Sequence, residues 1–420
     1  MELRPGYKQT EIGIVPEEWD VMPIGELFTF KNGLNKSKKY FGYGTPIVNY
    51  MDVFNCPALR LENLLGRVDV SKSELQSFEV RKGDVFFTRT SETVEEIGQA
   101  AAMLDKPVDT VFSGFVLRAR PLGSVLADGF KVYCFSPRYF RQQVISRATY
   151  TTRALTNGRA LSAAHLAVPP PPEQRAIAGA LADVDAAIAA TAKLLDKKCD
   201  LRTATMQRLL TGEVRLPGFS EEWHETRLGE HIRFQVGFPF RSKFFNTLGV
   251  GIRLIRNRDL KSDDEVVFYH GDLGEGYRVK NGDLLVSMDG DFSLKMWVGS
   301  DALLNQRVGR ITSAGAVDTS YLSFRLVGNL QEVERRTSST TVKHLSHRDV
   351  ENIKLSLPPL SEQIAIAEII QDVCAEIAAL ERRQKKLHDL KQAMMQALLT
   401  GRVRLPVETI EEAGKVLVDA

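Results

Sequence analysis

The stretch EQRAIAGALADVDAAIAATAKLLDKKCDLRTATMQRLLTGEVRLP occupies residues 173–217, and a second copy, EQIAIAEIIQDVCAEIAALERRQKKLHDLKQAMMQALLTGRVRLP, occupies residues 362–406. The two copies align without a gap at an offset of 189 residues, and 25 of their 45 positions are identical. A repeat of this length at the end of each half indicates a duplicated unit. The chain therefore consists of two bodies, each followed by a copy of the same segment.

Each copy is predicted to form one long helix. Prolines precede both copies, and glycines at 212 and 401 stand where a helix would end. Ser361 is the predicted N-cap of the second helix, and Glu173 and Glu362 would lie near the positive helix ends. About 38 residues at about 1.5 Å each predict helices on the order of 57 Å long.

Apolar residues recur along both copies at spacings of three and four, which is typical of a narrow coiled-coil seam. The predicted seam is Ile177, Leu181, Val184, Ile188 and Leu195 in the first copy, with Ile366, Ile370, Val373, Ile377, Leu380 and Leu387 in the second. Leu201 and Leu390 continue the pattern, while Thr191, Lys198 and Thr205 interrupt the first copy. Two such helices in one chain most simply pair with each other.

Composition limits the class of protein. The formal net charge of the 420 residues is +2, so any DNA contact must come from local patches. The four cysteines form no CxxC pair, which argues against a disulfide framework or a zinc ribbon. Neither a signal region nor a run of 18 apolar residues occurs, so we expect a soluble, cytoplasmic protein with no membrane contact.

Both bodies open alike, with Glu17-Glu18-Trp19 in the first and Glu221-Glu222-Trp223 in the second. Short β-branched runs between glycine, asparagine and aspartate predict strands at 45–48, 85–88, 111–117, 252–255, 283–287 and 321–326. A helix is predicted over 137–147. Each body is therefore predicted to be α+β.

These motifs carry a family resemblance. A variable body that opens with Glu-Glu-Trp, closes with Pro-Pro-x-x-Glu-Gln and leads through a long helix to Leu-Leu-Thr-Gly resembles the specificity subunit of type I restriction-modification systems. The resemblance covers both halves of the chain. It implies target recognition domains at 1–167 and 218–356, helical spacers at 168–217 and 357–407 that form an antiparallel coiled coil with a pseudo-twofold repeat, and a C-terminal tail at 408–420.

The resemblance also implies partners. Each recognition domain would read one half of a split sequence in double-stranded DNA, and the helices would dock two methyltransferase subunits. Restriction subunits are left open as further partners. S-adenosylmethionine, ATP and magnesium are implied for the partner subunits, with no cofactor or metal in this chain.

Candidate DNA contacts are clusters of basic and amide side chains, which suit phosphates and base edges. They are Lys31, Asn32, Lys36, Lys38, Lys39, Tyr40, Arg89, Thr90 and Ser91 in the first body, and Arg241, Lys243, Arg256, Asn257, Arg258 and Arg307 in the second. Polar segments before the helices add Arg153, Arg159, Arg336 and Lys343. A solvated face, or a hinge in the case of the polar segments, is the alternative interpretation of each cluster.

No phosphate loop, HExxH, GxSxG or amino-methyltransferase motif occurs, so no catalytic residues are predicted. His344 and His347 have metal-like spacing but no third ligand at a recognisable distance. Two alternatives to DNA recognition remain. The first is a coiled-coil scaffold that binds only proteins, and the second is an autonomous nuclease.

Overall fold

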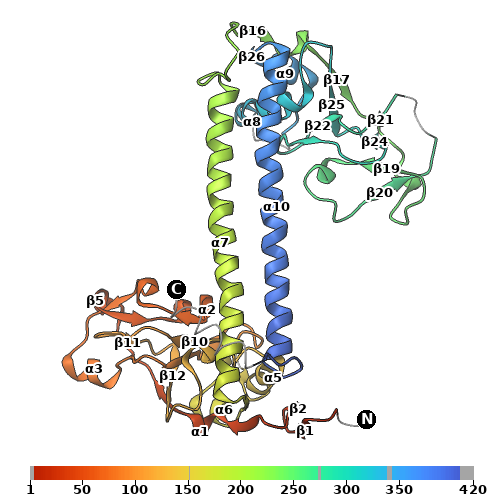
Figure 1. Ribbon diagram of the computed structural model, residues 1–420. Helices are drawn as coiled ribbons and strands as arrows, with labels where there is room; N and C mark the ends of the chain where they lie inside the picture. The colour runs from red at the N-terminus through yellow and green to blue at the C-terminus, as the bar shows by residue number, and fades with distance from the viewer. Residues whose placement is uncertain (1–3, 151, 273–275, 338–342, 407–420) are drawn as a thin grey trace, which may run out of the picture. The chain divides into compact units, whose positions relative to one another are not determined.

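The computed structural model describes residues 4–150, 152–272, 276–337 and 343–406. The chain divides into two compact units, Met1–Ala192 with Arg383–Ala420, and Lys193–Arg382. Each unit contains one sheet-bearing body and parts of both long helices, α7 (Pro171–Leu210) and α10 (Leu360–Leu398) (Figure 1). The predicted α+β class with an internal repeat is confirmed. The predicted C-terminal tail, 408–420, lies outside the described residues.

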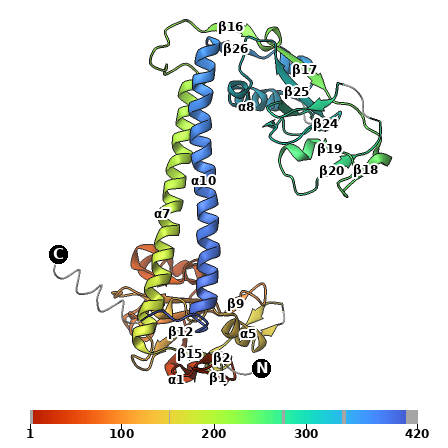
Figure 2. The same ribbon diagram turned by 45° about the vertical axis from the view of Figure 1, so that its right-hand side comes forward.

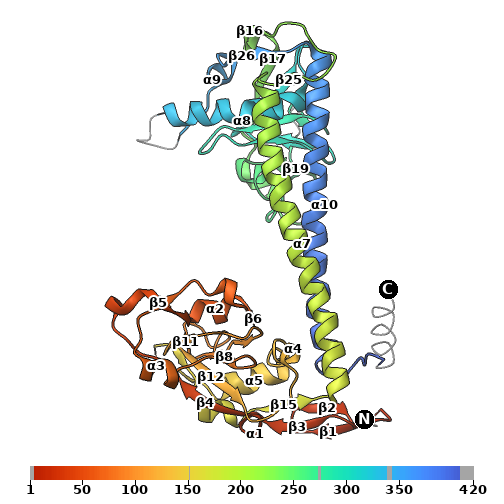
Figure 3. The same ribbon diagram turned by 60° about the vertical axis from the view of Figure 1, so that its left-hand side comes forward.

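The first body is built around a five-stranded sheet, whose strands β4, β12 and β8 lie side by side in Figure 3. The sheet order is β4 (Phe28–Asn32), β12 (Val116–Pro121), β8 (Val85–Thr88), β10 (Ala100–Met103) and β6 (Ala58–Leu59). Smaller sheets contain β1 (Tyr7–Thr10) with β2 (Gly13–Pro16), β3 (Asp20–Pro23) with β15 (His165–Val168), β11 (Val111–Phe112) with β5 (Phe41–Val48) and β7 (Arg67–Val68), and β13 (Thr149–Tyr150) with β14 (Ala154–Leu155) and β9 (Thr90–Ser91). The short helices are α1 (Ile24–Leu27), α2 (Tyr50–Asn55), α3 (Lys72–Ser77), α4 (Asp128–Lys131), α5 (Arg138–Ser146) and α6 (Gly158–Ser162), with 3₁₀ turns η1 (Lys38–Tyr40) and η2 (Leu61–Asn63).

The second body repeats this plan with a four-stranded and a five-stranded sheet (Figure 2). The sheet orders are β17 (Ile232–Val236), β25 (Val308–Ser313), β22 (Leu284–Ser287), β23 (Leu294–Met296), and β18 (Phe245–Asn246), β20 (Val267–Tyr269), β19 (Ile252–Ile255), β24 (Ala302–Leu304), β21 (Arg278–Val279). A further pair joins β16 (His224–Arg227) to β26 (Lys354–Leu357). The helices are α8 (Thr319–Arg336) and α9 (His347–Glu351), with 3₁₀ turns η3 (Leu228–Glu230), η4 (Ser242–Phe244) and η5 (Asn257–Leu260).

Three sequence predictions of local structure were wrong in detail. The strand predicted over 321–326 is helical, because the Asp318 side chain caps α8 by accepting the Tyr321 N–H at 2.7 Å and helical spacing buries Leu322 and Leu326. Ser361 lies inside α10, which begins one residue earlier. The strand predicted over 111–117 is split into β11 and β12 by a turn at 113–115.

The two long helices pair antiparallel within each unit. In the first unit, Lys391 of α10 forms an ion pair with Asp185 of α7 at 2.5 Å, and in the second unit Lys198 of α7 pairs with Glu376 of α10. The predicted seam residues Ile177, Leu181, Ile366, Ile370 and Ile377 are buried, and the other predicted seam residues are half-buried. The coiled-coil prediction is therefore confirmed.

The continuation of the seam pattern was wrong at two positions. Leu201 and Leu390, which occupy the same place in the two copies, are both 48% exposed. Two of the polar residues that interrupt the pattern have hydrogen-bond or ion-pair partners. Thr191 is buried with its hydroxyl donating to Ala187 O at 2.7 Å, and Lys198 reaches its carboxylate partner on α10.

The repeated motif at the start of each long helix forms a buried clasp. In the first clasp, the Glu173 carboxylate accepts the Trp19 indole N–H at 2.9 Å and two N–H bonds of Arg404 at 3.0 and 2.9 Å. In the second clasp, Glu362 accepts the same bonds from Trp223 and Arg215. Both carboxylates are at most 1% exposed, and their hydrogen bonds raise the pKa of both arginines. Each clasp therefore joins a body to the start of one long helix and to the segment that follows the end of the other, within its unit.

The glutamine that follows each clasp carboxylate is also buried and plays the same part in both copies. The Gln174 amide donates to Val125 and Pro169 carbonyls and accepts the Ala127 N–H at 2.8 Å. Gln363 makes the corresponding three bonds in the second unit. Buried amides must be hydrogen-bonded in this way, which explains why Glu-Gln is repeated.

Candidate nucleic-acid interface

In the second body, the predicted contacts gather around the turn that follows β22. Asp289 stands at its centre: its carboxylate accepts Arg307 Nη1 at 2.9 Å and contacts His344 Nδ1 at 2.8 Å, and its carbonyl accepts Asn257 Nδ2 at 2.9 Å. The Gly290 N–H donates to Lys343 O at 3.0 Å. Residues far apart in the sequence are thus held on one surface.

A hollow of about 600 Å³ lies beside this turn. Its lining includes four of the predicted contacts, Arg256, Asn257, Arg258 and Arg307, with Lys261 and Asn305. Such a hollow, lined by cations and amides, suits an anionic or base-edge ligand.

Each cation of the hollow has an acidic partner. The ion pairs are Arg256 with Asp259, Arg258 with Glu265, Lys261 with Asp291 and Arg307 with Asp289, at 2.6–3.0 Å. The hydrogen bond from Lys261 lowers the pKa of Asp291 below its ordinary value. Because the cations are oriented and locally neutralised, this surface favours selective contacts over a bulk attraction to phosphate.

Three predicted contacts of the second body lie apart from this hollow. Arg241 and Lys243 are exposed in and beside η4, where the Lys243 ammonium lies 4.8 Å from the Phe244 ring centre. Arg336, at the end of α8, pairs with Glu332 at 2.7 Å. The structure does not join them to Asp289.

In the first body, two predicted segments meet. Strand β14 pairs with β9, which places Ala154 opposite Ser91 and Leu155 opposite Thr90. Arg89 O accepts the Thr156 N–H at 3.0 Å, and Arg153 lies 3.9 Å from the Glu92 carboxylate. Arg159 is exposed on α6, which Asn157 caps at 2.9 Å. The loop after β8 and the polar segment before α7 thus form one edge.

The remaining predicted contacts of the first body form a second group near α3. Lys31 donates to Ser77 O at 2.6 Å, and Lys36 pairs with Glu74 at 2.8 Å. The hydrogen bond from Lys36 is the largest influence lowering the pKa of Glu74 to about 2. The Lys36 and Lys39 ammonium groups lie 4.7 and 5.0 Å from the Tyr40 ring centre. Asn32 and Lys38 are exposed beside them in the chain.

Sequence reasoning missed Asp289 and gave His344 only a metal-like spacing. Their pairing depends on an antiparallel bridge between residues 55 positions apart, which no local pattern indicates. Within the described ranges, no three histidine, cysteine, aspartate or glutamate side chains gather as a metal site.

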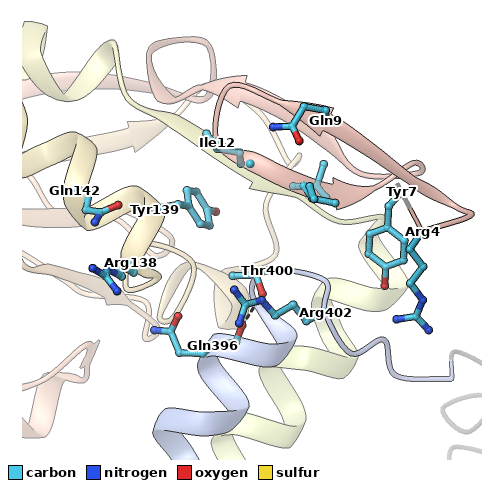
Figure 4. Close-up of a pocket in the computed structure, with 13 residues that line it drawn as sticks. Arg4, Tyr7, Gln9, Ile12, Arg138, Tyr139, Gln142, Gln396, Thr400 and Arg402 are labelled. Atoms are coloured by element: carbon cyan, nitrogen blue, oxygen red, sulfur yellow. Dashed lines mark hydrogen bonds between the residues drawn. The ribbon is translucent and has the colours of Figure 1, made fainter. Parts of the chain in front are cut away.

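A larger hollow, of about 1080 Å³, lies in the first unit and is shown in Figure 4. Side chains from the N-terminal segment and its hairpin, from α5, and from the end of α10 and the residues after it line the hollow, including Arg4, Tyr7, Arg138, Gln396 and Arg402. None of the predicted DNA contacts lines it. Tyr7 closes one side by donating its hydroxyl to Gly401 O at 2.8 Å.

These features define a class of protein: an internally duplicated α+β protein in which each body carries a polar edge and is clasped to an antiparallel helix pair. No helix in the described part of the chain is long and apolar enough to span a membrane. A family model described as the type I restriction modification DNA specificity domain matches residues 16–197 and again residues 221–389. The chain therefore belongs to the family of type I restriction-modification specificity subunits.

Relatives and solved structures agree with this assignment. The type I restriction enzyme EcoBI specificity subunit of Escherichia coli is 37% identical over 206 residues, which are 48% of this chain and 44% of that protein. The putative type I restriction enzyme MjaX specificity subunit of Methanocaldococcus jannaschii is 24% identical over 425 residues, with 95% of this chain and 97% of that protein covered. The crystal structure of the S subunit of a type I system from M. genitalium matches with a TM-score of 0.60 and 14% identity, over 95% and 98% of the two chains. At that identity the structural match establishes the fold.

Proposed function

We propose that this chain is the DNA sequence-recognition subunit of a type I restriction-modification complex. Each body reads one half of a split target sequence, and the helix pair sets the spacing between the halves. The observation that carries the proposal is the repetition of the whole unit, body and helix, because the family match covers residues 16–197 and 221–389. The alternative of a coiled-coil scaffold without DNA is not supported, since the match includes both bodies.

The proposal assigns methyl transfer to partner subunits. S-adenosylmethionine, ATP and magnesium would serve those partners, in the cytoplasm where the DNA lies. Two equivalent methyltransferase subunits would dock on the repeated helices. Leu201 and Leu390 support this stoichiometry, because the same exposed leucine occurs once in each copy and an exposed apolar side chain gains from burial against a partner. Restriction subunits would complete the complex.

Methylation mapping tests the proposal directly. The chain would be co-expressed with its neighbouring methyltransferase subunit, and modified bases would be located across a genome by single-molecule sequencing. We expect a split motif with a fixed spacer. Methylation without sequence preference by an assembled complex would contradict the proposal.

Two further measurements address the alternatives. The affinity of the complex for target DNA should fall steeply as salt rises, because phosphate contacts release counterions, whereas a protein-only scaffold has no such affinity. The chain alone should leave a plasmid intact in the presence of magnesium, and cleavage would favour the nuclease alternative.

A further inference from the structure

The turn before β12 in the first body and the turn before β25 in the second make the same backbone hydrogen bond. In the first body, the Arg89 N–H donates to Phe115 O at 3.2 Å, and in the second the Met288 N–H donates to Arg307 O at 3.0 Å. The strand ladders that follow both turns continue in the same register. Phe115 and Arg307 therefore occupy equivalent positions.

The segment that pairs with the residues after β8 or β22 provides a second pair of equivalent positions. Leu155 lies opposite Thr90 in the first body, where β14 pairs with β9. In the second body, His344 lies opposite Asp289 in an antiparallel bridge. Leu155 is therefore the counterpart of His344, and Thr90 is the counterpart of Asp289.

The helical turn that follows β5 or β19 adds a third pair of positions. The backbone N–H groups of Asn49 and Arg256 each donate at 2.7 Å to the carboxylate three residues later. Met51 and Arg258 follow these two residues at the same distance in sequence, so they are also counterparts.

The same three positions carry opposite chemistry in the two bodies. In the second body they hold Arg258, Arg307 and His344, and in the first body they hold Met51, Phe115 and Leu155, which are 54%, 63% and 38% exposed. A single exposed apolar side chain is ordinary. Here three exposed apolar side chains occupy the positions that are polar or cationic in the second body. This indicates that the ligand of the first body presents apolar groups at this edge.

We propose that these three equivalent positions form one recognition edge in both bodies, and that the edge of the first body contacts thymine methyl groups while Arg307 in the second contacts a guanine. This inference rests on the proposed DNA-recognition function. Thymine alone presents a methyl group in the major groove, and an arginine fork matches the O6 and N7 acceptors of guanine.

The Asp289 carboxylate is the positioning group for Arg307. It holds one guanidinium nitrogen at 2.9 Å, and the other N–H groups of this 64% exposed side chain have no hydrogen bond to the described residues, so they can face DNA. Thr90, the counterpart of Asp289, carries no charge. A carboxylate is not needed there, because Phe115 takes the place of the arginine that Asp289 positions.

Matched substitutions in the assembled methyltransferase complex test the proposal. Phe115→Ala should accept other base pairs at one T·A position in one half-site, and Arg307→Ala should lower discrimination at one G·C position in the opposite half-site by about tenfold or more. The controls are Leu65→Ala, which removes an 84% exposed side chain elsewhere in the first body, and Arg335→Ala on α8. Both controls should leave the mapped motif unchanged.

Target DNA with deoxyuridine in place of thymidine only at the T·A position that Phe115→Ala relaxes isolates one methyl group. Wild-type complex should bind such a first half-site about fourfold more weakly, and the Phe115→Ala complex should bind thymidine and deoxyuridine duplexes equally. Equal binding by the wild type would overturn the methyl contact.

The outcomes separate this inference from the proposed function. A wild-type complex without a split motif would contradict the function itself. A split motif that either Phe115→Ala or Arg307→Ala leaves unchanged at every position would overturn the recognition edge while the function stands. Because both side chains are exposed, assembly of the variant complexes confirms that folding is intact.

Discussion

The buried carboxylates of Glu173 and Glu362 show how single residues fix this fold. Each is removed from water at the start of a long helix and is satisfied by an indole N–H and an arginine fork. Leaving a buried carboxylate short of a donor is costly, because the desolvated charge keeps its need for hydrogen bonds. The repeated glutamate, tryptophan and arginine therefore act as one set within each unit.

Replacing Trp19 by phenylalanine tests the first clasp. The change removes the 2.9 Å bond to Glu173 from a fully buried ring, so the free energy of unfolding should fall by at least about 1.5 kcal/mol. Urea denaturation followed by circular dichroism measures this. Trp223→Phe is the matched control and should cost less, because its bond is 3.2 Å long and its ring is half-buried. Equal losses in both variants would contradict the argument.

Glu74 predicts a pH dependence. Its pKa lies at about 2 in the folded protein against an ordinary value of 4.5, chiefly because Lys36 donates to the charged form. A depressed folded-state pKa stabilises the fold above pH 4.5, and this contribution is lost as the pH falls from 4.5 toward 2. The difference in urea midpoint between wild type and Glu74→Gln should therefore be smaller at pH 3 than at pH 6. A difference independent of pH would exclude this ion pair as its source.

At the scale of elements, the long helices are predictable because their composition and periodicity agree with their tertiary role. Alanine, leucine, glutamate and glutamine favour a helix, and apolar residues recur along both copies at spacings of three and four. The short strands were harder to predict. The 113–115 turn interrupts a β-branched run, and α8 buries Tyr321, Leu322, Leu326 and Leu330 on one helical face. In both places tertiary packing overrides local propensity.

Helix length should set the target spacer. Because α7 and α10 pair antiparallel, one heptad inserted after Lys193 needs a matching heptad after Arg382 to keep the seam in register. The paired insertion adds about 10 Å of helix, so the spacer should lengthen by about three base pairs with both half-sites unchanged. Methylation mapping measures the spacer. Altered half-sites with the original spacer would reject this role for the helices.

At the scale of the whole molecule, duplication allows the two bodies to diverge while the clasps stay alike. The same buried glutamate and glutamine hold both bodies, whereas the recognition edges hold different side chains. One body can therefore change what it reads without disturbing how it is held.

Exchanging the first body alone should change one half of the target. A chimera that replaces residues 20–168 with the corresponding segment of another specificity subunit keeps Trp19 and Glu173, and so keeps the first clasp. We expect a new first half-site, an unchanged second half-site and an unchanged spacer in the methylation map. Changes in both halves would contradict independent reading by the two bodies.

The sequence by itself determined the duplication, the paired helices and the α+β class, because a repeat appears when the sequence is aligned with itself and apolar periodicity appears within a single segment. The sequence also predicted candidate DNA contacts such as Arg256, Arg258 and Arg307 from clusters of basic and amide residues. Only the tertiary structure gathered these three around one hollow, with Arg307 bound to Asp289, and placed Arg241 and Arg336 elsewhere. It alone showed that Phe115 stands where Arg307 stands in the other body. That equivalence depends on strand register and on backbone hydrogen bonds between residues far apart in the sequence. No local sequence pattern predicts either of them.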